Sequence, residues 1–222
     1  MFELIKIDWK KYNLKRIPLY FILIYVIVAG MTYSVLNLLG GVLIDNASAV
    51  IDLLLKTIFL IVESVLITTI VISEFKDKTI LLLYSYPISK QKLIIAKVLL
   101  VVLLSLAGIL CGQVFLNLMF FGLHKFIPDI RFSITPAEIF SYGFTSVMVV
   151  FLGLLPMCIG LVKYSTVATM VTSIIILLVG SNSGLGMDNL IGNSLFTITL
   201  GIIGLAATIY SINNLLNRDM KV

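Results

Sequence analysis

The sequence predicts an all-α membrane protein with six transmembrane helices, an N-terminal interfacial helix, and a broken or re-entrant element before the last helix. Of its 222 residues, 60 % are hydrophobic and only 12 % are charged, whereas roughly a quarter of the residues of a soluble protein are charged. Leu, Ile and Val gather in long runs that approach the roughly 20 residues of a membrane-crossing helix. A transmembrane barrel would instead need strands of alternating polarity, so the runs indicate helices.

The apolar runs place the six spans at residues 18–39, 50–73, 93–121, 136–161, 166–180 and 194–216. Thr135, Pro136 and Glu138 form a capping-box pattern that starts the fourth span. Pro156, which has no backbone N–H, predicts a kink at 152–156 within that span. The fifth span reaches only about 22 Å, short of a hydrocarbon core of about 30 Å. The glycine-rich polar stretch after it therefore predicts the broken or re-entrant element.

Residues 1–16 are expected to form an interfacial helix along the inner leaflet. Phe2, Ile5, Trp9 and Tyr12 share one arc of a helical wheel, and five basic residues accompany them.

The distribution of lysine and arginine predicts the topology. With the N-terminus inside, thirteen of the sixteen basic residues lie in cytoplasmic segments, as the positive-inside rule requires. We therefore expect a multi-pass protein of the cell (plasma) membrane with both termini in the cytoplasm. The net charge of +5 then reflects this topology, and nucleic acid is not an expected partner.

The second span carries ionisable residues along one stripe. Asp52 and Lys56 are four residues apart and can pair near the outer surface, where Lys56 can also reach the headgroups. Glu63 lies about 16 Å further along the axis, near mid-bilayer, where an ionised acid costs at least about 2.5 to 3.5 kcal/mol. Glu63 either lines a translocation path or a seam between two permease subunits, or is a neutral side chain bonded to a neighbouring helix. Gln113 and Asn117 of the third span are candidate neighbours.

Gly108 and Gly112 in the third span have the small-xxx-small spacing that lets another helix approach closely. The approaching helix can belong to this chain or to a second copy.

Enzyme signatures are missing from the sequence. No G-x-x-x-x-G-K-[ST] loop, HExxH or CxxC motif occurs, and His124 is the one histidine. The chain is therefore expected to be no enzyme and to bind no cofactor or metal. Any dependence on ATP must come from a separate subunit that binds ATP and Mg.

The connector 74–90 between the second and third spans carries a family pattern. An acid, Glu74, follows the second span; Thr79 begins an apolar run; and Ser-x-Pro-x-Ser-Lys closes the connector around Pro87. This pattern resembles the ABC-2 type transporter permeases, although Lys78 stands where the family usually has glycine. Thr79 can also cap the run 80–83, whose apolar side chains are unfavourable in the cytosol unless a partner buries them.

The resemblance implies one transmembrane permease domain over 1–222, which presents residues 77–84 as a coupling helix to an ABC ATPase subunit. The residues that it assigns to ATPase coupling are Glu74, Asp77, Lys78, Thr79, Leu82, Leu83 and Pro87. It also implies a second permease, the same chain or a sister chain. Small Gram-positive peptide exporters and bacteriocin-immunity permeases are similar, which suggests a hydrophobic or amphipathic peptide as substrate and leaves drugs, lipids and polysaccharide open. The alternatives are a small secondary carrier and the substrate-binding membrane component of a vitamin importer.

Overall fold

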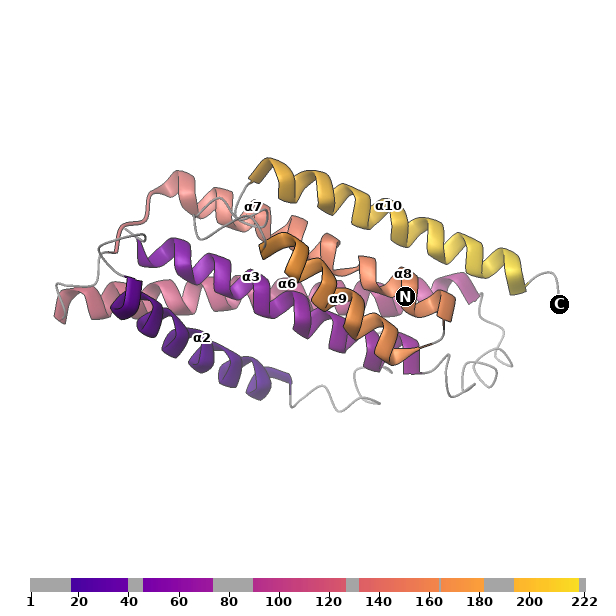
Figure 1. The fold of residues 1–222 in the computed structure, drawn as a ribbon, viewed down its shortest axis with the longest axis horizontal. Helices are drawn as coiled ribbons and strands as arrows, with labels where there is room; N and C mark the ends of the chain where they lie inside the picture. The colour runs from indigo at the N-terminus through magenta and orange to yellow at the C-terminus, as the bar shows by residue number, and fades with distance from the viewer. Residues whose placement is uncertain are drawn as a thin grey trace.

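The computed structural model describes residues 17–39, 46–73, 90–126, 132–163, 165–181 and 194–219, and within these ranges it holds helices and no strand. The helices are α2 (Ile17–Leu39), α3 (Ala47–Ile67), the π-helix η2 (Thr68–Ile72), α6 (Lys90–Phe126), α7 (Pro136–Gly153), α8 (Leu155–Lys163), α9 (Thr166–Ser181) and α10 (Ser194–Asp219). The all-helical prediction is confirmed for this part of the chain (Figure 1). The predicted interfacial helix and the predicted broken element after α9 lie outside the described residues.

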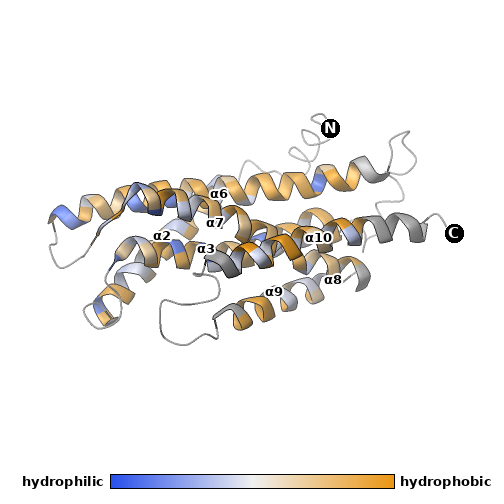
Figure 2. Cartoon of the chain, turned by 90° about the horizontal axis from the view of Figure 1, so that it is seen from above, coloured by the Kyte–Doolittle hydropathy of each residue, from blue (hydrophilic) through white to orange (hydrophobic). Residues whose placement is uncertain are grey.

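Three stretches of the described chain are long and apolar enough to cross a membrane: Ile17–Leu38, Leu93–Phe126 and Pro136–Leu161. Shorter apolar helices cover Thr166–Val179 and Thr197–Ile212. Hydrophobic residues (orange) predominate along the helices in Figure 2, and large apolar side chains such as Leu19, Phe115 and Leu178 are exposed on the surface of the bundle. The chain is therefore a membrane protein with several apolar helices, while the count of six spans stays a prediction.

Helix α3 occupies the middle of the bundle. It packs against α2, α6, α7 and α9, and α10 lies along α7 and α8 (Figure 1). Phe59, Leu60 and Ile67 of α3 are fully buried among side chains of these neighbours. Because lipid tails are as apolar as these side chains, close packing and hydrogen bonds between helices hold such a bundle together.

Glycines allow some of the neighbouring helices to approach each other closely. A methyl group at Gly108 of α6 would overlap the Phe59 ring, and one at Gly112 would come within 2.7 Å of the Tyr25 ring. The small-xxx-small spacing thus serves packing inside this chain. On α10, Gly201 and Gly204 lie directly on the backbone of α7.

Local signals set the ends of α7. The Thr135 hydroxyl accepts from the Glu138 N–H at 3.3 Å, and the Glu138 carboxylate accepts from the Thr135 N–H at 2.7 Å, which confirms the capping box. The predicted kink is confirmed as well, because α7 ends at Gly153 and α8 begins at Leu155. The π-helix η2 was not predicted. Its i to i+5 hydrogen bonds widen the last turns of the second span before Ser73.

Candidate functional site

A buried ion pair lies at the centre of a cluster of polar side chains contributed by α3, α6 and α7. Lys56 donates to Asp52 one turn earlier on α3, which confirms the predicted pair. The Lys56 ammonium also donates to the Thr145 hydroxyl of α7 at 2.7 Å and lies 5.7 Å from the centroid of the Tyr142 ring. Lys56 is only 2 % exposed, so its amine stays inside the bundle instead of reaching the headgroups.

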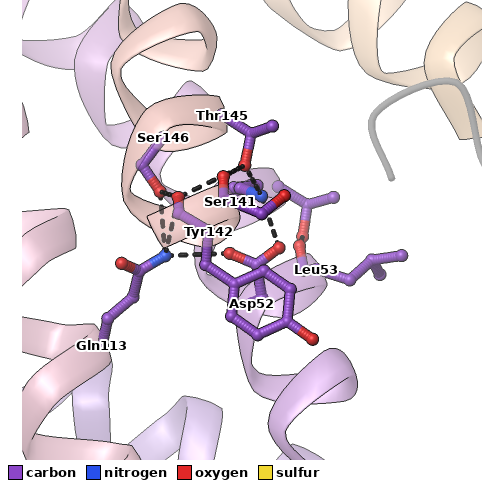
Figure 3. Close-up of polar contacts among 9 residues, drawn as sticks. Asp52, Leu53, Gln113, Ser141, Tyr142, Thr145 and Ser146 are labelled. Atoms are coloured by element: carbon purple, nitrogen blue, oxygen red, sulfur yellow. Dashed lines mark hydrogen bonds and ion pairs between the residues drawn. The ribbon is translucent and has the colours of Figure 1, made fainter. Parts of the chain in front are cut away.

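Gln113 adds a third helix, α6, to the cluster, because its side chain contacts the Asp52 carboxylate. Its amide donates to Asp52 at 2.8 Å and to the Ser146 hydroxyl of α7 at 2.8 Å (Figure 3). The hydroxyls of Thr145 and Ser146 donate in turn to backbone carbonyls one turn earlier on α7. Each residue of the cluster therefore has a hydrogen-bond partner, as a buried polar network requires.

The cluster Asp52, Lys56, Gln113, Thr145 and Ser146 ties α3, α6 and α7 together at one level of the bundle. Opposite charges on Asp52 and Lys56 cancel, so the cluster adds no net charge to an apolar interior. Removing one partner would leave an uncompensated buried charge, at a cost of about 3–5 kcal/mol. No group of three or more His, Cys, Asp or Glu side chains that could hold a metal occurs in the described residues.

Gln113 and Asn117 also line a groove of about 410 Å³ between α6 and α7. Most of its wall is apolar, with Leu110, Val114, Leu118, Phe121, Phe132, Ile134 and Ile139 among the lining residues. The Asn117 amide donates to the Gln113 carbonyl at 2.8 Å. Two of the three residues predicted for a pathway or subunit seam thus meet in one groove beside the buried ion pair.

Glu63, the third of these residues, lies elsewhere. It is eleven residues from Asp52 on α3, about 16 Å along the axis, and its carboxyl group lies against Gly153 at the end of α7. It is 1 % exposed, so within this chain it faces the interior of the bundle. Gln113 and Asn117 are directed to the level of Asp52 and not to Glu63.

The residues predicted to couple to an ATPase, Glu74, Asp77, Lys78, Thr79, Leu82, Leu83 and Pro87, lie outside the described residues. The ends of their segment are described. Helix α3 continues through η2 to Ser73, and α6 begins at Lys90. Segment 74–90 therefore joins the two helices that carry Asp52, Glu63 and Gln113.

Sequence comparison defines the class to which this helical membrane protein belongs. The profile described as "ABC-2 family transporter protein" matches residues 4–184, most of the chain. The chain belongs to the ABC-2 family of transporter membrane proteins, whose members are permease components and not the ATPase.

The chain is also similar to one curated protein. The "Uncharacterized protein YcbO" of Bacillus subtilis (strain 168) is 32 % identical over 149 residues. The alignment covers 65 % of this chain and 65 % of the length of the relative. No solved structure matches the chain.

Proposed function

We propose that the chain is the membrane-spanning permease subunit of an ATP-driven exporter that moves hydrophobic or amphipathic peptides out of the cell. Membership of the ABC-2 family is the observation that carries this proposal. The sequence has no ATP-binding loop, so a separate ABC ATPase would bind ATP and Mg and supply the energy. In this arrangement both termini and segment 74–90 face the cytoplasm, where the ATPase is.

Segment 74–90 is the proposed docking element for the ATPase. Its run 80–83 consists of Ile and Leu, and such a run gains stability when a partner removes it from water. Movement of the segment would pull on the end of α3 at η2. From there α3 contacts α7 through Glu63 and Gly153 and contacts α9 through the Ser64 and Ser173 hydroxyls, 3.1 Å apart. Movement of the segment would thus be transmitted through α3 to α7 and α9.

A second permease is part of the proposal because the interior of one chain is filled. Large apolar side chains such as Phe59 and Leu60 occupy the space around α3, so a substrate needs a passage at the surface of the bundle. Such a passage forms where two permeases, identical or sister chains, face each other.

The groove between α6 and α7 supports an amphipathic substrate. Its apolar wall suits a hydrophobic side chain or segment, while Gln113 and Asn117 offer hydrogen bonds to peptide groups. A wholly polar cargo would gain nothing from this wall. We therefore favour peptides with apolar character.

The experiment co-expresses the tagged full-length chain with the ABC ATPase encoded beside it and measures copurification. Replacing Leu82 and Leu83 by Asp is expected to abolish the association, because two charges would have to enter an apolar contact. Ser85→Asp adds a charge to the same segment without removing an apolar side chain and is expected to retain most of the ATPase. Equal capture by the wild type and the Leu82→Asp/Leu83→Asp variant would refute the docking role, as would no capture by the wild type.

A further inference from the structure

Glu63 is a buried acid for which the proposed transport function has no chemical role. Its side chain is 1 % exposed, and its Oε1 atom has no hydrogen-bond partner among the described residues. Such an atom inside a membrane bundle is costly, because no water replaces the missing bond.

The carboxyl group lies at the break between α7 and α8. A methyl group on Gly153, the last residue of α7, would overlap the Glu63 Oε2 atom and come within 2.6 Å of its Cδ. Only a residue without a side chain lets the acid approach the backbone this closely. The acid therefore touches the main chain where α7 stops.

The break leaves backbone carbonyls without their usual helical donors. Pro156 has no N–H for the carbonyl of Leu152, four residues earlier, and that carbonyl accepts from the Leu154 N–H instead. The N–H of Met157 is bonded to the Leu154 carbonyl at 3.0 Å, three residues back instead of the usual four, so it is directed away from the Gly153 carbonyl. Carbonyls of this kind accept hydrogen bonds, and a carboxylate cannot donate one. A carboxylic acid can.

Among the described residues, no salt bridge to Glu63 is formed. Of the described basic residues on its own helix, Lys56 is already bound by Asp52 and Thr145. An ionised acid in the hydrocarbon region without a partner costs at least about 2.5–3.5 kcal/mol.

We propose that Glu63 is a proton-binding site inside the bundle: a neutral carboxylic acid that donates a hydrogen bond to a carbonyl released at the α7–α8 break. The ligand is a proton, and the bond fixes the angle between α7 and α8. The π-helix η2 begins five residues after Glu63 on the same helix. The proposal concerns the folded chain alone and does not depend on an ATPase partner.

Infrared spectroscopy of the purified full-length chain in lipid at neutral pH tests the protonation. The wild type is expected to show the C=O stretch of a protonated carboxyl group, and Glu63→Gln is expected to lose it. The double variant Asp52→Asn/Lys56→Met removes the other buried acid of α3 together with its charged partner and is expected to retain the band. A wild-type spectrum without the band, or a band that persists in Glu63→Gln, overturns the proposal.

A pair of variants tests the hydrogen bond. Glu63→Gln keeps an N–H donor of similar size, whereas Glu63→Leu fills the same space without one. We expect the thermal midpoint of Glu63→Gln to stay near the wild-type value and that of Glu63→Leu to fall by several degrees. Failure of Glu63→Leu alone to fold is the extreme form of the expected result. Equal midpoints for the two variants would show that no donated bond is needed and would refute this part of the proposal.

Discussion

Gly204→Ala tests the close contact by which α10, the last described helix, packs against α7. A methyl group at this position would overlap the carbonyl oxygen of Phe151, at 2.9 Å from the carbonyl carbon and 3.1 Å from the Leu152 Cα. Carbon atoms are in optimal contact at about 3.5–4.0 Å, so α10 would have to move away by roughly 0.5–1 Å. The obstacle is backbone, which cannot rotate aside as a side chain can.

The expected loss follows from two opposing effects. Overpacking costs about 1–3 kcal/mol, while replacing glycine by alanine within a helix gains about 1 kcal/mol. Gly30→Ala is the matched control, because a methyl group on Gly30 of α2 would meet nothing within 4 Å. The gain in helix propensity cancels between the two variants, so Gly204→Ala should be less stable than Gly30→Ala by about 1–3 kcal/mol.

The assay is reversible unfolding of the full-length chain in lipid-detergent mixtures, followed by circular dichroism at a helix-sensitive wavelength. A lower unfolding midpoint for Gly204→Ala than for Gly30→Ala supports the close contact. Equal midpoints would mean that α10 does not lie on the backbone of α7 as described.

Two further substitutions test the buried ion pair and the start of α7. Lys56→Met should destabilise the chain by about 3–5 kcal/mol because Asp52 is left charged and buried. Adding Asp52→Asn should restore part of this stability in the same unfolding assay. A Lys56→Met variant as stable as the wild type would contradict the pairing. Thr135→Ala should cost about 1 kcal/mol through loss of the cap on Glu138. Ser34→Ala removes a hydroxyl that donates to the Gly30 carbonyl of its own helix and should reduce the stability less than Thr135→Ala. A larger loss of stability for Ser34→Ala would exclude a working capping box.

Features encoded by neighbouring residues could be predicted from the sequence. The Thr135 capping box and the break before Pro156 each depend on a pattern a few residues long, and the structure has both. The Asp52–Lys56 ion pair could also be predicted from a local pattern, because residues four apart on a helix share a face. Apolar runs also placed each described helix to within a few residues of its observed bounds.

Contacts between distant helices could not be predicted in the same way. Gln113 meets Asp52 from 61 residues away, and this depends on the register of α6 against α3, for which a single sequence has no signal. Thr145 and Ser146 read as ordinary hydroxyls in an apolar helix, since such side chains usually bond to their own backbone. The register explains why Gln113 contacts Asp52 and not Glu63.

The π-helix η2 escaped prediction for a different reason. Its sequence, Thr-Thr-Ile-Val-Ile, fits an ordinary helix in lipid, and η2 packs against α6, α8 and α9, which are distant in sequence or not adjacent to it. Ile72 lies where a methyl group on Gly160 of α8 would have to go. Tertiary packing of this kind becomes visible only in the folded chain.

Transport into sealed vesicles tests the central claim most directly. The chain and its ABC ATPase, reconstituted together in lipid vesicles, should move a labelled amphipathic peptide only when ATP and Mg are supplied on the side of the ATPase. Vesicles with the Leu82→Asp/Leu83→Asp variant should show no ATP-dependent movement. Movement of the peptide by the chain alone, driven by a proton gradient and indifferent to ATP, would contradict the account.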